Sequence, residues 1–132
     1  MNINCSFKQQ NVRSLNLSQG LEKTRKKIDA LTHESDDIIF IINCQIRKNK
    51  ATVQREFLTC KNGPYMTYFN SDSPRAAGVG IAIRLCSDIE VLDQVKDNHD
   101  RILILKTMIE DETLHLSHFT TPTKIKMCTL NK

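Results

Sequence analysis

Histidine and cysteine are the residues of this sequence whose side chains most readily act as bases, nucleophiles and metal ligands. His115 and His118 lie three residues apart in a segment with a strand pattern, so they are expected on opposite faces and cannot hold one ion together. His33 and His99 lie in predicted loops, and no Cys–His or Ser–His–Asp set can be assembled. An odd number of well-separated cysteines argues against a disulfide framework or a zinc cluster: they stand at positions 5, 44, 60, 86 and 128. We expect reduced thiols in an intracellular protein, in the nucleus or the cytoplasm.

The start of the chain is predicted to form a strand, a helix and a second strand. Residues 5–12 suit a strand, and Asn16 or Ser18 can cap a helix over about 18–32. The segment 37–43 is a continuous apolar run rich in isoleucine, which is typical of a strand buried on both faces. A strand, a helix and a buried strand make a βαβ unit, so the two strands are expected to be parallel.

The rest of the chain is dominated by predicted strands. A short helix is expected over 51–59, whereas the tail 123–132 shows little pattern. The segments 101–109 and 113–119 flank an acidic turn and are predicted to form an antiparallel hairpin. A strong turn is expected at 62–64, and further strands at 65–69, 78–85 and 89–95. We therefore predict the α+β class, with a mixed β-sheet and helices on its face.

Size and composition favour one globular domain, 1–132. A chain of 132 residues can bury a real core, and 39% hydrophobic with 26% charged residues is not the composition of a disordered protein. No apolar run approaches the roughly 18 residues that a membrane span needs. The N-terminus has no charged region followed by an apolar one, so no secretory signal is predicted, and we expect no membrane partner.

The net charge of +4 is unevenly distributed. Residues 1–61 carry 11 Lys and Arg against 6 Asp and Glu, whereas residues 62–132 carry 8 against 9. A basic half can attract the phosphate backbone of DNA in a weak, salt-sensitive way, and an ordinary solvated surface is an equal alternative. The candidate nucleic-acid-binding residues are Arg13, Lys23, Arg25, Lys26, Lys27, Arg47, Lys48 and Lys50.

Five segments follow one another in an order that resembles a known family. Asn-Val-Arg-Ser-Leu-Asn stands at 11–16, and Asp-Ile-Ile-Phe at 37–40. A glycine-bearing strand follows at 75–83, then Arg-Ile-Leu-Ile-Leu-Lys at 101–106 and His-Phe-Thr-Thr-Pro at 118–122. Their order and spacing resemble the first half of an endonuclease/exonuclease/phosphatase domain, and most of all the endonucleases of LINE-type retrotransposons.

The resemblance covers about residues 5–123 and implies both a fold and a chemistry. The fold would be the N-terminal half of a four-layer domain, and the chemistry would be hydrolysis of phosphodiester bonds with Mg²⁺. The family's main metal ligand is a Glu at the position of Asn43, which offers an amide oxygen but no charge. Asn11 matches a residue that orients this carboxylate or the phosphate. Thr120 stands where the family has a phosphate-contacting Tyr, and it keeps the hydroxyl without the ring.

These departures lead to competing hypotheses. The first is a degenerate, catalytically inactive fragment of a retrotransposon-type endonuclease that holds no Mg²⁺ or other cofactor, since the later Asp-x-Asn and Ser-Asp-His motifs have no counterpart. The alternative is a non-catalytic nucleic-acid-binding module on the same scaffold. A third hypothesis is an active metal-dependent nuclease that uses unrecognised ligands, with completion by another chain as one form of it. Alternatively, Asn43 is simply a polar residue at the end of a strand, and Asn11 uses its amide to bond the local backbone. Half a domain should leave one sheet face open, through which self-association is expected.

Overall fold

The computed structural model describes residues 5–33, 36–61, 63–72, 77–99, 101–120 and 123–129, and the side chains of residues 48 and 119–129 lie outside this description. Two α-helices, two short 3-10 helices (η) and eight strands follow one another in the described part. In chain order they are β1 (Phe7–Asn11), η1 (Leu17–Gln19), α1 (Leu21–Thr32), β2 (Ile38–Ile42), η2 (Arg47–Asn49), α2 (Lys50–Thr59), β3 (Tyr65–Asn70), β4 (Val79–Arg84), β5 (Ile89–Lys96), β6 (Ile102–Ile109), β7 (Glu112–Thr120) and β8 (Thr123–Thr129).

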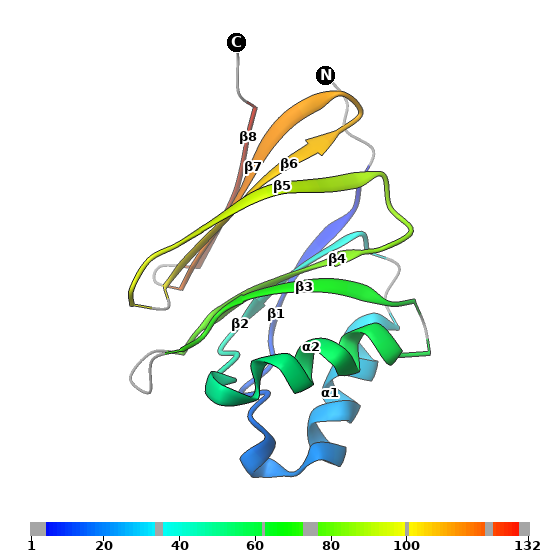
Figure 1. Ribbon diagram of the computed structural model, residues 1–132, viewed down its shortest axis with the longest axis vertical. Helices are drawn as coiled ribbons and strands as arrows, with labels where there is room; N and C mark the ends of the chain where they lie inside the picture. The colour runs from blue at the N-terminus through cyan, green and yellow to red at the C-terminus, as the bar shows by residue number, and fades with distance from the viewer. Residues whose placement is uncertain are drawn as a thin grey trace.

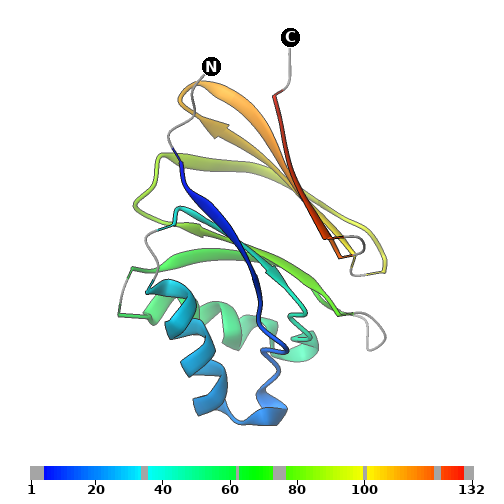
Figure 2. The same cartoon turned by 180° about the vertical axis from the view of Figure 1, so that it is seen from behind.

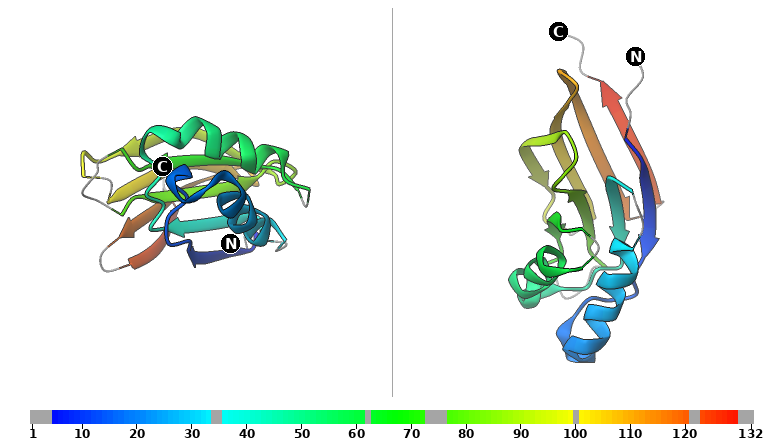
Figure 3. Two further views of the ribbon diagram at one scale, coloured as in Figure 1. Left: turned by 90° about the horizontal axis from the view of Figure 1, so that it is seen from below. Right: turned by 90° about the vertical axis from the view of Figure 1, so that its right-hand side faces the viewer.

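The elements form three layers. Two four-stranded sheets pack face to face, and α1 and α2 cover the outer face of the first sheet (Figure 1). Within the described part of the chain, no helix covers the outer face of the second sheet (Figure 3). This α+β sandwich agrees with the predicted fold class, and the uncovered face is the outer side of β5–β8. No helix among the described residues is long and apolar enough to cross a membrane.

The first sheet has the strand order β1-β2-β4-β3 and contains the predicted βαβ unit. β1 and β2 are parallel, with Asn11 opposite Ile42, and α1 connects them. β4 pairs with both β2 and β3 in the antiparallel direction, so the sheet is mixed, as the sequence predicts. Parallel strands end at the same side of a sheet, and we call the place where β1 and β2 end, at Asn11 and Ile42, the strand-end edge.

β2 is apolar on both faces because both faces are covered. Ile39 and Ile41 belong to the core beneath the helices, whereas Ile38 and Phe40 belong to the core between the two sheets. Side chains alternate across a strand, so one isoleucine-rich run serves both cores. Four of the five residues of β2 are buried, so this strand holds the strand-end edge between the two layers.

The start of the first helix differs from the prediction. Leu17–Gln19 form the short helix η1, for which the Oδ1 of Asn16 accepts the Ser18 N–H at 2.9 Å. The chain then turns at Gly20, whose φ of 104° lies in a region that favours glycine and cannot continue a helix. A helix from residue 18 is therefore wrong, and α1 begins at Leu21.

The second sheet is an antiparallel meander with the order β5-β6-β7-β8. The β6–β7 hairpin is confirmed, and its turn residues Glu110 and Asp111 both have positive φ, as a tight turn matched to strand twist requires. The expectation of a patternless tail was wrong, because Thr123–Thr129 form β8. The free edge of β7 supplies its backbone partners, and the alternation Lys-Ile-Lys-Met within that segment is a period-two signal of a strand.

Candidate functional site

The two asparagines that the sequence singles out meet at the strand-end edge. Asn11 ends β1, and Asn43 follows β2 directly. The Asn43 Nδ2 donates to the Asn11 Oδ1 at 2.9 Å, and the backbone N–H of Arg13 donates to the same oxygen at 3.1 Å. Parallel pairing thus brings together residues that lie far apart in the sequence, and both lone-pair directions of the Asn11 oxygen are used.

Backbone strain is concentrated in the two loops that leave this edge. Among non-glycine residues, Arg13 and Ser14 after β1, and Asn43, Gln45 and Arg47 after β2, have φ values between 47° and 81°. Conformations of this kind cost on the order of 1 kcal/mol each and persist where the surroundings impose them, often at ligand-binding or catalytic sites. The edge is therefore a locally constrained part of the molecule.

Hydrogen bonds hold the two strained loops against each other and against the sheet. The backbone N–H groups of Ser14 and Leu15 donate to the carbonyls of Asn43 and Cys44, each at 2.7 Å. The buried Ser71, after β3, accepts the Ile46 N–H at its Oγ at 2.9 Å. These bonds explain how the structure maintains the unusual backbone, and they make the edge a preorganised platform.

Lys27 has a structural position in this platform. Its Nζ donates to the carbonyls of Arg13 and Ser14, both at 2.9 Å, and to the Oε1 of Gln19 at 3.1 Å. An ammonium group has three donors, so these three contacts use all of them. The pKa of Lys27 is lowered, first by partial burial and then by the nearby cations Lys23 and Arg13. The candidate phosphate ligand of the sequence analysis is thus a clamp on the β1–α1 loop.

The other predicted cations are distributed over different surfaces. Arg13 and Lys23 lie with Lys27 on the β1 side of α1, whereas Arg25 and Lys26 lie on the α2 side. Arg47 and Lys50 lie in η2 and at the start of α2, beyond the other loop of the edge. The Lys50 Nζ pairs with the Asp72 carboxylate at 2.9 Å, and the side chain of Lys48 is outside the described part. The eight candidates therefore do not form one continuous face.

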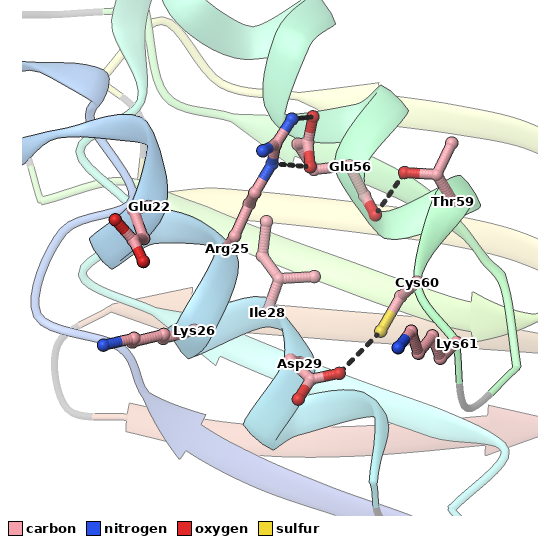
Figure 4. Close-up of a pocket in the computed structure, with 9 residues that line it drawn as sticks. All are labelled: Glu22, Arg25, Lys26, Ile28, Asp29, Glu56, Thr59, Cys60 and Lys61. Carbon is pink, nitrogen blue, oxygen red and sulfur yellow. Dashed lines mark hydrogen bonds and ion pairs between the residues drawn. The ribbon is translucent and has the colours of Figure 1, made fainter.

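A pocket of about 470 Å³ between α1 and α2 contains charges of both signs (Figure 4). Arg25 binds Glu56 with its Nε 2.7 Å and its Nη2 3.3 Å from the two carboxylate oxygens. The Cys60 thiol donates to Asp29 Oδ1 at 3.4 Å, and both residues line the pocket (Figure 4). Opposite charges satisfy one another here, so this pocket has no marked preference for an anion or a cation.

A second groove, of about 610 Å³, lies between β1 and α1 and reaches the strand-end edge. Figure 2 shows these two elements from behind, with β1 in dark blue at the sheet edge. The described residues that line the groove include four cations and no carboxylate: Lys8, Arg13, Lys23 and Lys27. Amides of Gln10, Asn11 and Gln19 also line it. We call this the β1–α1 groove.

Lys8 and Gln10 are not among the site residues predicted from the sequence, although the strand pairing indicates where their side chains lie. Lys8 is paired with Ile39 and Gln10 with Ile41 in the parallel register. Residues paired across neighbouring strands point to the same face, so both belong to the helix-covered side of the first sheet. A polar pair on this face, beside two buried isoleucines, indicates that α1 leaves β1 uncovered there.

The histidines do not complete a catalytic site at the edge. His118 is fully buried between the sheets, and its Nε2 lies 2.9 Å from the Ile41 carbonyl. A carbonyl only accepts, so Nε2 carries the proton, and burial lowers the pKa of His118 to about 4. His115 is half-buried on the opposite face of β7, as the odd spacing predicts. His118 is thus a neutral link between the two sheets.

The described residues supply no cluster of metal ligands at the strand-end edge. Among the described residues, no group of three or more His, Cys, Asp or Glu is arranged to hold a metal ion. β7 runs in the same direction as β2 (Figure 1) and ends at Thr120, whose side chain lies outside the described part. Cys5, Cys44, Cys60 and Cys86 are free thiols.

No protein-family model matches the chain, and no curated protein matches it. The resemblance to the endonuclease/exonuclease/phosphatase family therefore rests on the ordered motifs in the sequence. The geometry of the strand-end edge is observed directly in the structure and does not depend on a similarity to another protein.

Proposed function

We propose that the chain is a degenerate fragment of a metal-dependent DNA endonuclease domain of retrotransposon type, and that it does not cleave DNA. The observation that carries this proposal is the Asn11–Asn43 amide pair at the end of two parallel strands. The family resemblance puts a metal-binding Glu at position 43 and its orienting Asn at position 11. The two residues are in direct contact, which supports the correspondence, and neither bears a charge.

Two neutral amides are a poor site for the divalent cation that such a reaction needs. Mg²⁺ prefers charged carboxylate oxygens and a well-defined octahedral shell, and its charge stabilises the transferred phosphoryl group. The Asn11 oxygen already accepts two N–H groups, and Asn43 directs its Nδ2 donor into the pair. The remaining Asn43 oxygen is a single neutral ligand. Strong metal binding is therefore not expected here.

Restoring the carboxylate alone would not restore the site. With Glu at position 43, the carboxylate would face the Asn11 Oδ1, and two acceptors would oppose each other. Asn11 could turn its Nδ2 towards the carboxylate, but its oxygen would then leave the Arg13 N–H in the strained loop. The surroundings of Asn43 thus suit an amide, which supports a site without a metal-binding carboxylate at position 43.

A non-catalytic nucleic-acid-binding module on the same scaffold is the second candidate function. The observation that favours it is the β1–α1 groove, which is lined by four cations and, among the described residues, by no carboxylate. The two functions are compatible, because a fragment that has lost its metal site can still bind a phosphate backbone.

The test is plasmid nicking by the purified chain in Mg²⁺ or Mn²⁺, with an EDTA control. We expect no nicking above background by the parent chain or by Asn43→Glu, because groups that act as a unit are not rescued singly. Isothermal titration with Mn²⁺ should show at most a gain in metal affinity for Asn43→Glu. Metal-dependent nicking by the parent chain that is abolished by Asn11→Ala would overturn the proposal and favour an active nuclease with other ligands.

A further inference from the structure

The β1–α1 groove differs from the α1–α2 pocket in its charge. Lys8 lies on β1, Arg13 in the strained loop after it, and Lys23 and Lys27 one helical turn apart on α1. The α1–α2 pocket, on the opposite side of the same helix, is lined by three cations and three carboxylates. A groove whose described lining has four cations and no carboxylate raises the local concentration of anions.

The cations of the groove are close enough to act on one another. Lys23 and Arg13 both lower the pKa of Lys27, after the effect of its burial. Lys27 donates its three N–H groups to Arg13, Ser14 and Gln19, so it adds positive charge to the groove but has no further donor for a ligand. Arg13 and Lys23 bring their charges to the groove from the loop after β1 and from α1, and Lys8 adds a third charge from β1. An anion lying between them would relieve their mutual repulsion.

The remaining lining residues narrow the class of ligand. No aromatic side chain lines the groove among the described residues, so stacking of exposed bases has no platform there. The groove is also lined by Val12 and Leu31. The Gln10 amide gives one N–H to the Asn11 carbonyl at 3.4 Å and has a second that can donate to a phosphate or sugar oxygen, whereas the Gln19 amide donates to Ser14 and Thr24 at 2.9 and 3.0 Å. Cations and amides without aromatic or acidic groups fit a sugar-phosphate backbone and have little means of reading bases.

We propose that the β1–α1 groove binds the phosphate backbone of nucleic acid without reading its sequence, through Lys8, Arg13 and Lys23. The proposal rests on the second proposed function and names its site. It places binding on the helix-covered side of β1, beside the strand-end edge, and it does not need a metal or an intact catalytic group. Binding by such contacts is salt-dependent and similar for unrelated sequences.

The test is fluorescence anisotropy with short labelled duplexes of two unrelated sequences, over about 50 to 200 mM salt. The groove variant is Lys8→Gln with Lys23→Gln, and the control is Lys26→Gln with Lys61→Gln in the α1–α2 pocket. Each loses two lysines, so both change the net charge from +4 to +2. We expect the groove variant to bind at least about ten-fold more weakly and its salt slope to fall by about 2, while the control keeps the parent slope.

The possible outcomes distinguish failure of the proposed groove from failure of nucleic-acid binding as a function. No binding by the parent chain at about 100 μM and low salt would overturn nucleic-acid binding altogether. Equal losses in both variants would leave nucleic-acid binding in place and overturn the groove, since the effect would follow net charge alone. If the chain bound anionic phospholipid vesicles more strongly than duplex, with the same dependence on Lys8 and Lys23, the ligand of the groove would be a membrane surface and the proposal of nucleic acid would be overturned. Thermal melting checks the fold of each variant, and Arg13→Gln substitutes for the pair if it does not fold.

Discussion

The two sides of α1 carry similar charged side chains but use them differently. Facing β1, Lys27 donates to the carbonyls of Arg13 and Ser14 and holds a loop in place. Facing α2, Arg25 pairs with the carboxylate of Glu56, and the Arg25 side chain is 58% exposed. A charge bound to fixed backbone acceptors stabilises chain geometry, whereas a charge paired with another in water stabilises little.

Polar groups that bind fixed backbone acceptors are therefore expected to stabilise the fold, whereas exposed ion pairs can be substituted at little cost. His118 belongs with Lys27, because it also binds a backbone carbonyl, that of Ile41 in β2. Substitution of either residue should loosen the platform or the contact between the sheets. Substitution on the α2 side of α1 should leave both unchanged. Three experiments test this comparison, in order of the effect expected.

The largest effect is expected for His118 in acid. Its pKa in the folded chain is about 4, below the ordinary 6.5 of an exposed histidine. Between these two values the unfolded chain binds a proton that the folded chain excludes, so stability falls as the pH falls from about 6.5 to 4. The loss approaches about 3 kcal/mol, and all of this stability is present above pH 6.5.

Urea unfolding of the parent, His118→Gln and His115→Gln at pH 7 and pH 4.5 measures this contribution. The glutamine at 118 can donate to the Ile41 carbonyl but does not titrate, so its loss of stability in acid should be smaller than that of the parent. His115→Gln, on the half-buried opposite face, should keep the parent's pH dependence. Parallel curves for all three proteins would show that His118 is not the group that responds to pH.

The second effect is expected for Lys27→Met. The substitution keeps the apolar stem but leaves the exposed Arg13 carbonyl and the partly buried Ser14 carbonyl without their donor, which should cost about 1 kcal/mol. The matched control, Lys26→Met on the α2 side of α1, should stay within about 0.5 kcal/mol of the parent. Hydrogen exchange should also speed up at the Ser14 and Leu15 amides, which bind the β2 loop. Equal unfolding energies for the two variants would remove the distinction between the two sides of α1.

The position of the edge could be predicted from the sequence because it follows from one strong pattern. The isoleucine-rich run of β2 indicates a doubly buried strand, and a helix before it implies a parallel partner. Asn11 and Asn43 therefore had to lie at the same side of the sheet. The positive φ values of the loops could not be predicted, because they are maintained by hydrogen bonds between the two loops and by a contact with Ser71 after β3.

The distribution of the cations was only partly predictable. The helical period separates Lys23 and Lys27 from Lys26, so two groups on α1 could have been expected. Which group would be neutralised depends on where α2 puts Glu56, and that is set by packing across the first sheet. The role of Lys8 depended on the register of β1, since a shift of one residue would turn it to the other face.

The smallest effect is expected for Arg25→Gln and Glu56→Gln on the α2 side. The pair has good geometry, but the arginine lies in water, where salt screens the attraction and holding the long side chain costs entropy. The unfolding midpoint of each single variant and of the double variant should stay close to that of the parent at physiological salt. A small loss that appears only at low salt would agree with this. A coupling between the two residues as large as the effect of Lys27→Met would show that the α1–α2 contact also stabilises the fold, and the two sides of α1 would no longer differ in kind.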